Sequence, residues 1–228
     1  MRGRTDRGVV FDFDLTLVDL KLDHDAMVEH LRKATSALGI SHLATSWSSA
    51  FGAYRELVDE VLLEDPGRDR IKRRLDQAMA AGEYLAYPIA EAYPGAKEVL
   101  EYLRARDFRI GLVSSNSLRI IESTSRKFRL WRFFDAVWGR ESYGRLKPAP
   151  DKIRGCCTQL GIEGCFYVGD DPSDMDAAIR ASCRGIAVIR LTDRLPTPSP
   201  AVLRERGAER LVWSVKELPD LFEELFPG

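Results

Sequence analysis

The sequence predicts an α/β protein in which a parallel sheet carries helices on both faces and a small helical unit is inserted near the N-terminus. Two observations support this class. From about residue 96 onward, amphipathic helical stretches alternate with short apolar runs, which is typical of chains that build a parallel sheet. Between about residues 20 and 87 the pattern is helical throughout and contains no convincing strand.

The composition is that of a globular protein. With 228 residues, 45% of them hydrophobic, the chain can form one full core, or a core with an insert. The formal net charge of −1 gives no general attraction to nucleic acid or to an anionic membrane, and no segment is long and uncharged enough to span a bilayer. The first apolar run is interrupted by Asp12 and Asp14 before it reaches the length of a signal peptide, so we expect a cytoplasmic location. The four cysteines include no C-x-x-C pair, which favours reduced, mostly buried thiols and agrees with that location.

The first strand is predicted at residues 9–13, a short apolar run rich in β-branched and aromatic residues. Asp12 and Asp14 stand at its end, two positions apart. Because alternate side chains of a strand point to the same side, we expect the two carboxylates to share one site. An aspartate at a strand end often only caps a turn, so this pair indicates a functional site only if other polar motifs are predicted beside it.

The helical insert follows this strand. Three stretches of helical periodicity lie within residues 20–87, with breaks expected at Gly39 and at Pro66-Gly67. We predict a cap over residues 19–89, inserted into a core of residues 1–18 and 90–228, with hinges near residues 18–20 and 87–90. A basic run at residues 68–74 is interpreted as a solvated helix face.

Helices and strands alternate in the remainder of the chain. The helices are predicted at residues 96–106, 117–128, 151–160 and 173–181, and the strands at 108–113, 136–138, 165–168 and 185–189. Residues 191–200, rich in Pro, Thr and Ser, are predicted to form a loop. An edge strand at residues 210–213 and a closing helix at 215–225 complete the predicted fold.

Polar residues follow four of the predicted strands. After Asp12 and Asp14 these are Ser114, Ser115 and Asn116, then Lys147, and finally the segment Gly169-Asp170-Asp171-Pro172-Ser173-Asp174. Ligands of open parallel sheets bind beyond the carboxyl ends of the strands. The four groups are therefore expected to meet in one place.

The residue types in this group favour a metal and an anionic substrate. Carboxylates a few ångströms apart repel one another by on the order of 1–4 kcal/mol per pair, and a divalent cation with hard oxygen ligands offsets that repulsion. A site only partly filled by carboxylates suits Mg²⁺, which retains several waters. The ammonium of Lys147 and the hydroxyl of Ser114 are groups that hold phosphate oxygens.

In chain order, the segment Asp12-Phe13-Asp14-Leu15-Thr16, Ser114 after an apolar strand, Lys147 before Pro148, and Gly169-Asp170 with Asp174 resemble the four motifs of the haloacid dehalogenase-like (HAD) hydrolase superfamily. The resemblance covers essentially the whole chain, and its layout is similar to the phosphoglycolate phosphatase and β-phosphoglucomutase branch. It implies a Rossmann-like core and a Mg²⁺-dependent phosphatase that hydrolyses a small phosphomonoester, phosphoglycolate-like or a sugar phosphate, through an aspartyl-phosphate. A phosphomutase or pyrophosphatase is the alternative among enzymes, and an idle binding protein is the alternative outside them.

The resemblance also implies roles for the first and last motifs. Asp12 is the nucleophile, and Asp14 protonates the leaving alcohol and later takes a proton from the attacking water. Mg²⁺ is held by Asp12, by the backbone carbonyl of Asp14 and by Asp170, which we prefer to Asp171 because Gly169 immediately precedes it.

Further residues are expected to support these. Ser114, Ser115, Asn116 and Lys147 bind the transferring phosphoryl group, and Asp174 orients the metal ligands or their waters. Thr16 is expected to brace its loop through a hydroxyl-to-backbone hydrogen bond, with direct contact to the substrate as the alternative. Asn116 either caps the following helix or contacts phosphate through its backbone N–H.

Leu15 departs from the pattern, because phosphatases of this branch usually carry glycine there. If the position requires positive φ, leucine is costly, so either the loop geometry differs slightly or Leu15 turns toward the cap as part of the pocket. The residues considered for substrate contacts from the cap are Lys21, His24, Trp47, Arg55 and Arg73, although each type is more often a surface or core residue. We expect a small phosphorylated metabolite as partner, no nucleic acid, no membrane, and a monomer or homodimer.

Overall fold

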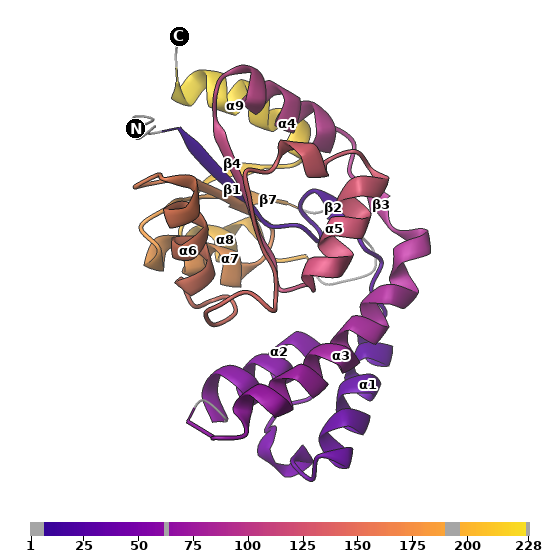
Figure 1. Ribbon diagram of the computed structural model, residues 1–228. Helices are drawn as coiled ribbons and strands as arrows, with labels where there is room; N and C mark the ends of the chain where they lie inside the picture. Colours follow the sequence, from indigo (N-terminus) through magenta and orange to yellow (C-terminus); the bar gives the residue numbers. More distant parts are fainter. Residues whose placement is uncertain (1–6, 62–63, 190–196, 227–228) are drawn as a thin grey trace.

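The computed structural model describes residues 7–61, 64–189 and 197–226. Its central element is a six-stranded sheet in the order β5-β4-β1-β6-β7-β8, in which all neighbouring strands are parallel. The strands are β1 (Gly8–Phe11), β4 (Arg109–Val113), β5 (Ala136–Trp138), β6 (Phe166–Gly169), β7 (Arg184–Val188) and β8 (Ala208–Val212). Helices cover both faces and a helical insert projects from one end (Figure 1), so the predicted fold class is confirmed.

Alternation along β1 explains how the two faces are covered. Val9 and Phe11 belong to one apolar cluster, whereas Val10, pointing the other way, belongs to a second. The first cluster receives side chains from α4 (Ala96–Ala105), α5 (Leu118–Lys127) and α9 (Leu218–Leu225), and the second from α6 (Asp151–Leu160) and α7 (Pro172–Arg180). Helix α8 (Pro200–Glu205) packs beside β8 at the edge of the sheet. With side chains buried on both faces, β1 is fixed in the middle of the molecule.

The insert consists of helices α1 (His24–Ala37), α2 (Ala50–Arg55) and α3 (Arg68–Ala86). Single turns of 3₁₀ or π helix accompany the main elements at Ser41–Leu43, Glu56–Val61, Tyr87–Ile89, Trp131–Phe133 and Val215–Glu217. Within the basic run of α3, Arg70, Arg73 and Arg74 are exposed as predicted. Lys72 instead pairs with Asp76 at 2.8 Å.

Two short strands that the sequence did not predict lie where the insert joins the core. β2 (Val18–Asp19) pairs with β3 (Glu91–Ala92) in antiparallel register, so the two linkers of the insert run side by side. Strands of two residues are too short to produce a period in the sequence. We propose that the boundaries of a cap over residues 19–89 fall at this pair.

Other differences concern the ends of elements. β1 ends at Phe11 rather than at residue 13, although the N–H of Asp12 still donates to the carbonyl of Val168 at 2.8 Å. The edge strand begins at Ala208, two residues earlier than predicted, and α8 was not predicted. Of the loop predicted at 191–200, residues 191–196 lie outside the described part of the chain.

Cys165 and Cys183 form a disulfide, so the expectation of reduced thiols is wrong for this pair. They directly precede β6 and β7, which are neighbours in register, and their Cα atoms are 4.9 Å apart. Cys156 and Cys157 are free and buried, and burial raises the pKa of the Cys157 thiol to about 11. The disulfide depends on strand register, which the spacing of the cysteines along the sequence does not reveal.

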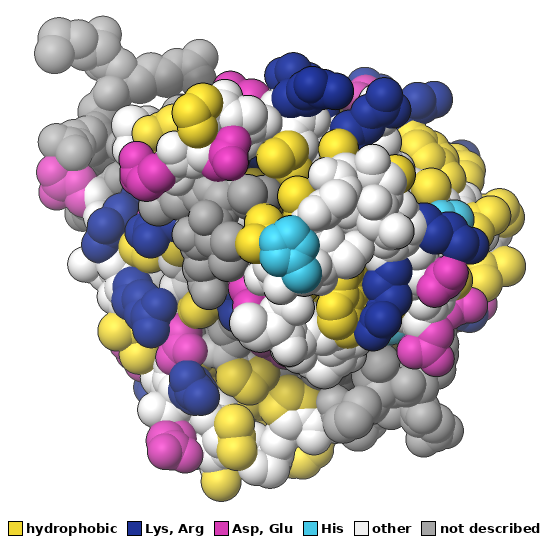
Figure 2. All heavy atoms as spheres, turned by 90° about the horizontal axis from the view of Figure 1, so that it is seen from below, with side chains coloured by type: hydrophobic (Ala, Val, Ile, Leu, Met, Phe, Trp, Pro, Cys, Tyr) yellow, Lys and Arg dark blue, Asp and Glu magenta, His cyan; other side chains and the backbone are white. Residues whose placement is uncertain are grey.

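The surface near the insert and the character of the helices are relevant to membrane or nucleic-acid partners. Seen from the end that carries the insert (Figure 2), basic, acidic and hydrophobic side chains are interspersed. Among the described helices, none has both the length and the apolar character needed to cross a membrane.

Candidate active site

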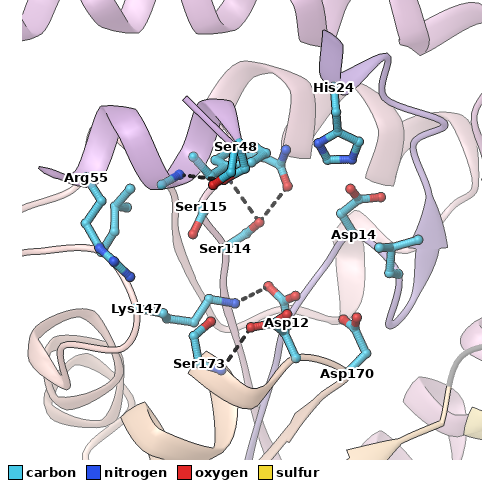
Figure 3. Close-up of a pocket in the computed structure, with 17 residues that line it drawn as sticks. Asp12, Asp14, His24, Ser48, Arg55, Ser114, Ser115, Lys147, Asp170 and Ser173 are labelled. Carbon is cyan, nitrogen blue, oxygen red and sulfur yellow. Dashed lines mark hydrogen bonds and ion pairs between the residues drawn. The ribbon is translucent and has the colours of Figure 1, made fainter. Parts of the chain in front are cut away.

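The carboxyl ends of β1, β4 and β6 meet the insert at a cavity of about 610 Å³ (Figure 3). From the core it is lined by Asp12, Asp14, Leu15, Ser114, Ser115, Asn116, Leu146, Lys147, Asp170, Asp171 and Ser173, and from the insert by His24, Ser48, Ser49, Phe51, Gly52 and Arg55. The structure therefore brings together the strand-end residues that the sequence singled out. Thr16 and Asp174 are fully buried and lie behind this lining.

Asp12 and Lys147 form the centre of the site. Asp12 is 7% exposed, and its Oδ1 lies 2.7 Å from Nζ of Lys147. Burial raises the pKa of Asp12 to about 7; Lys147 opposes this increase and Asp174 adds to it. Burial alone would lower the pKa of Lys147, but Asp12 and Asp174 raise it well above its usual value. The lysine is therefore a permanent positive charge beside a carboxylate that titrates near neutrality when no metal is bound.

Asp174 positions its neighbours. Its Oδ2 accepts hydrogen bonds from the N–H groups of Asp170 and Asp171 at 3.1 and 3.0 Å, and its Oδ1 lies 2.5 Å from Nζ of Lys147. A Cβ atom at Gly169 would come within 2.5 Å of the Asp174 carboxylate, so only glycine allows this close approach. Both carboxylate oxygens of Asp174 are thus engaged in holding Asp170 and Lys147 in place.

The carboxylates of Asp170 and Asp171 have different hydrogen-bond partners. Asp171 is the N-cap of α7 and accepts from the N–H of Ser173 at 2.9 Å. Asp170 is 3% exposed, and its Oδ1 accepts from the hydroxyl of Thr16 at 3.1 Å. This separation favours Asp170 over Asp171 as a metal ligand. The expected hydroxyl-to-backbone bond of Thr16 is wrong, because the hydroxyl bonds the Asp170 side chain instead.

The carboxylates fit a hard divalent cation. Oxygen atoms of Asp12, Asp170 and Asp174 lie within 4.8 Å of one another. Since Asp174 uses both oxygens for hydrogen bonds, Asp12 and Asp170 are the better placed side-chain ligands, and all-oxygen donors suit Mg²⁺.

Asp14 stands apart from this cluster. Its Oδ1 accepts from the backbone N–H of Leu20 at 2.8 Å, so the side chain is held by the linker into the insert. It lines the cavity, and Figure 3 shows His24 above it. A carboxyl group in this position faces the space where a leaving group would lie and is suited to proton transfer.

Leu15 adopts positive φ, at 63°, and lines the cavity. A different loop geometry therefore does not explain the missing glycine. The second expectation, that Leu15 forms part of the pocket, is confirmed. Leucine is strained in this region, so its side chain occupies the pocket at a cost in stability.

The loop after β4 is organised by Ser114 and Asn116. The hydroxyl of Ser114 donates to Oδ1 of Asn116 at 2.9 Å, and the N–H of Asn116 donates to Oγ of Ser114 at 3.2 Å. The N-cap of α5 is Ser117, whose side chain accepts from the N–H of Ile120. The alternative that Asn116 caps this helix is therefore wrong.

Two of the five cap candidates, His24 and Arg55, line the cavity. The other three do not: Lys21 pairs with Glu91 at 2.7 Å, Trp47 packs with the guanidinium of Arg32 4.7 Å from its ring centroid, and Arg73 is exposed. The insert also supplies four lining residues that were not predicted from the sequence: Ser48, Ser49, Phe51 and Gly52.

The buried ion pair of Glu83 and Arg140 was also not predicted. Leu75, Met79 and Glu83 follow one another at intervals of four on the buried side of α3. In the sequence, Glu83 could therefore have been recognised as a charged residue within the apolar stripe of a helix, which indicates a buried charge with a partner.

Comparison with known proteins identifies relatives of this chain. A family model described as haloacid dehalogenase-like hydrolase matches residues 9–188. A phosphoglycolate phosphatase of Cereibacter sphaeroides is 31% identical over 223 residues, with 96% of this chain and 98% of that protein covered. A phosphoglycolate phosphatase of Aquifex aeolicus is 26% identical over 184 residues, with 78% of this chain and 82% of that protein covered.

Solved structures show the same fold. A predicted phosphatase from Clostridium acetobutylicum matches with a TM-score of 0.68 and 21% identity, covering 96% of this chain and 100% of that one. A hydrolase from Pseudomonas syringae matches with a TM-score of 0.67 and 20% identity, covering 96% of this chain and 99% of that one.

Proposed function

The chain belongs to the phosphoglycolate phosphatase-like branch of the haloacid dehalogenase-like hydrolase family, and on this premise we propose that it hydrolyses a small phosphomonoester with Mg²⁺ through an aspartyl-phosphate on Asp12. It is a phosphatase by family. The observation that carries the proposal is the position of Asp12: it lies at the tip of the central strand, with its Oδ1 2.7 Å from the ammonium of Lys147 and open to the cavity.

In the first step an oxygen of Asp12 attacks phosphorus, and the bond between phosphorus and the leaving oxygen breaks. Asp14 donates its proton to the leaving oxygen, which departs as an alcohol. In the second step Asp14 takes a proton from water, and the resulting attack on phosphorus releases phosphate and restores the Asp12 carboxylate. Its contact with Leu20, at 2.8 Å, keeps Asp14 facing the leaving group in both steps.

The transferring phosphoryl group is held by the loop after β4 and by Lys147. We assign contacts to Ser114, Ser115, Asn116 and the ammonium of Lys147, all of which line the cavity. When bound, Mg²⁺ would neutralise charge on the phosphoryl oxygens, and the residues to hold it are Asp12, the backbone carbonyl of Asp14 and Asp170. Thr16 and Asp174 orient Asp170 for this role.

The leaving group is recognised from the insert. A cavity of about 610 Å³ is in the range of small-molecule sites, which supports a small metabolite such as phosphoglycolate or a sugar phosphate. His24 and Arg55 supply the ionisable side chains on the insert side. A cytoplasmic location, the absence of nucleic-acid and membrane partners, and a monomeric or homodimeric state stay predictions.

The test is phosphate release from a panel of phosphoglycolate, sugar phosphates, nucleoside monophosphates and an aryl phosphate, with Mg²⁺ and with a chelator. We expect Mg²⁺-dependent release of one phosphate from at least one small monoester. Conversion of a sugar phosphate to its isomer would establish the mutase alternative, and release of two phosphates from pyrophosphate the pyrophosphatase. A folded protein that acts on none of these compounds would contradict the proposal.

A further inference from the structure

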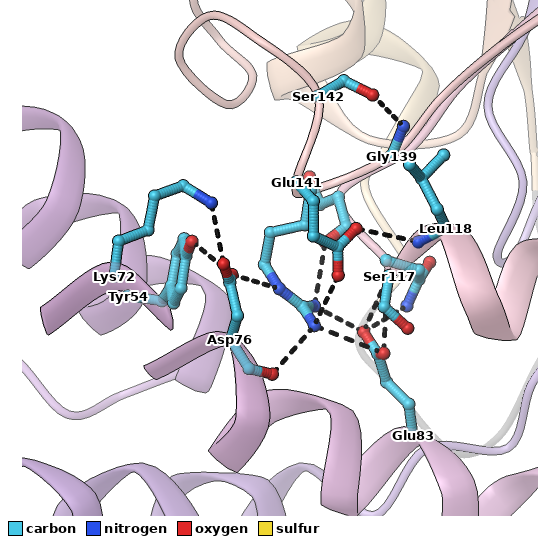
Figure 4. A network of polar contacts seen from close by, with 12 residues as sticks. Tyr54, Lys72, Asp76, Glu83, Ser117, Leu118, Gly139, Glu141 and Ser142 are labelled. Carbon is cyan, nitrogen blue, oxygen red and sulfur yellow. Dashed lines mark hydrogen bonds and ion pairs between the residues drawn. The ribbon is translucent and has the colours of Figure 1, made fainter. Parts of the chain in front are cut away.

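A buried ion pair connects the insert to the core beside the active site (Figure 4). Glu83, near the C-terminal end of α3, is 0% exposed, and Arg140, which follows β5, is 1% exposed. Nη1 of Arg140 lies 2.5 Å from Oε1 of Glu83, and Nη2 donates to Oε2 at 3.4 Å. Removing either side chain would lower the stability of the protein, because the charge of the other would be left buried without its main partner.

The Glu83 carboxylate also reaches the loop that holds Ser114. It accepts from the backbone N–H of Ser117 at 3.2 and 3.3 Å and from Nδ2 of Asn116 at 3.5 Å. A carboxylate only accepts hydrogen bonds, so the amide nitrogen of Asn116 must face Glu83. Its amide oxygen then faces the hydroxyl of Ser114, as the 2.9 Å bond between them records.

Arg140 holds the backbone of the same loop. Its Nη1 donates to the carbonyl of Ser115 at 3.2 Å, and its own N–H donates to the carbonyl of Asn116 at 2.7 Å. The loop is therefore fixed on one side by Arg140 and on the other by Glu83, which itself holds Arg140. A helix of the insert thus contributes directly to the shape of a loop in the core.

Asp76 provides a comparison within the same network. It lies two turns earlier on α3, and its Oδ1 accepts from Nε of Arg140 at 3.2 Å and from the hydroxyl of Tyr54 at 2.6 Å. No hydrogen bond recorded among the described residues joins Asp76 to Asn116 or Ser117. Asp76 therefore shares the ion pairing of Glu83 but not its contacts with the loop.

We propose that Glu83 is a positioning residue for phosphate: it sets the orientation of the Asn116 amide and, through the hydrogen bonds between Asn116 and Ser114, the position of the Ser114 side chain in the loop that binds the phosphoryl group. The inference rests on the proposed function, in which Ser114 and Asn116 hold that group. It follows that phosphate in the cavity and the seating of the C-terminal part of α3 stabilise each other, since such coupling is reciprocal.

The test compares Glu83→Gln with Asp76→Asn, using inorganic phosphate as the probe. Glutamine keeps the shape of Glu83 but adds an amide donor where Arg140 and Ser117 already supply donors, so it cannot satisfy both sides. We expect Glu83→Gln to weaken phosphate binding, measured by calorimetry, by about 10-fold, in line with the loss of one or two hydrogen bonds. KM for the best substrate should rise by a similar factor and kcat should change less.

Asp76→Asn is the matched control. Both variants are expected to lower the melting temperature, but Asp76→Asn should bind phosphate within about twofold of the wild type, because it leaves the loop contacts intact. Equal phosphate binding in wild type and Glu83→Gln, or an equal loss in both variants, would show that Glu83 only anchors α3 and would overturn the inference. Failure of the wild type itself to bind phosphate would overturn the proposed function instead.

If Glu83→Gln does not fold, amide hydrogen exchange of the wild type with and without phosphate gives the answer. Bound phosphate should slow exchange in residues 80–86 of α3 as well as in residues 114–117. Protection confined to residues 114–117 would contradict the coupling.

Discussion

The backbone N–H of Leu20 donates to Oδ1 of Asp14 at 2.8 Å, so the group proposed as the general acid is held by the first linker of the insert. Asp12, two positions earlier, is held by Lys147 in the core. The two carboxylates thus leave the same strand end but have different supports. This separation allows one to act as nucleophile and the other to transfer protons without sharing a partner.

Asp14→Asn is expected to lower kcat for alkyl phosphates by about 10²- to 10⁴-fold, because asparagine can accept from Leu20 but cannot supply a proton. The loss should be smallest for an aryl phosphate, whose leaving group needs little protonation. Steady-state kinetics on both substrate types measures the difference. An equal loss for both would argue against Asp14 as the acid.

Substitutions of Leu15 can show whether the backbone is strained at this position. Because its φ is 63°, glycine at this position should be more stable than alanine by about 1 kcal/mol, although glycine is normally the less stable of the two. Denaturant unfolding of Leu15→Gly and Leu15→Ala gives this comparison, in which both variants lack the leucine side chain. Both should also shift selectivity toward larger leaving groups, since Leu15 lines the cavity. Greater stability of the alanine variant would contradict the assigned conformation.

Thr16 is expected to influence metal binding through Asp170. Thr16→Val keeps the shape but removes the hydroxyl that donates to Asp170 Oδ1 at 3.1 Å. The Mg²⁺ concentration for half-maximal activity should rise by about 10- to 100-fold, with a smaller effect on kcat at saturating Mg²⁺. Thr16→Ser retains the donor and is the control. Unchanged Mg²⁺ dependence in Thr16→Val would remove this role.

The raised pKa of Asp12 predicts a pH dependence of stability in metal-free protein. Between pH 3.8 and about 7, the folded state binds a proton on Asp12 that the unfolded state has released. The contribution of Asp12 to the free energy of unfolding therefore falls as pH rises through this window and is fully present only below it. The difference between wild type and Asp12→Asn, measured by denaturant unfolding with a chelator, should decrease with pH. A difference that increases would mean that the folded pKa is lowered instead.

Much of the fold and of the site could be predicted from the sequence because the signals are local. The strands β1, β4 and β6 are visible in the sequence as apolar runs. Because ligands bind at the carboxyl ends of parallel strands, Asp12, Ser114 and Asp170 could be predicted to share one site, and all three line the cavity. Lys147 lies in the loop after β5 and lines the same cavity, as expected.

What the sequence did not reveal depends on contacts between distant elements. Glu83 and Arg140 are 57 positions apart and meet only because α3 seats against the core. Cys165 and Cys183 meet because β6 and β7 are in register. Among the cap candidates, His24 begins α1 and lines the cavity, whereas Trp47 lies in the loop before α2 and packs against Arg32, and helical periodicity does not reveal this difference.

The covalent mechanism on Asp12 can be tested by trapping the phosphorylated enzyme. Wild type and Asp12→Asn are mixed with the best substrate and Mg²⁺, quenched in acid within one turnover, digested, and analysed by mass spectrometry. We expect a phosphoryl group on Asp12 in the wild type, and neither phosphoenzyme nor turnover in Asp12→Asn, which should fold normally because asparagine preserves the shape of the side chain. Near-normal turnover by Asp12→Asn, or phosphate release by the wild type without any phosphorylated Asp12, would contradict the covalent mechanism.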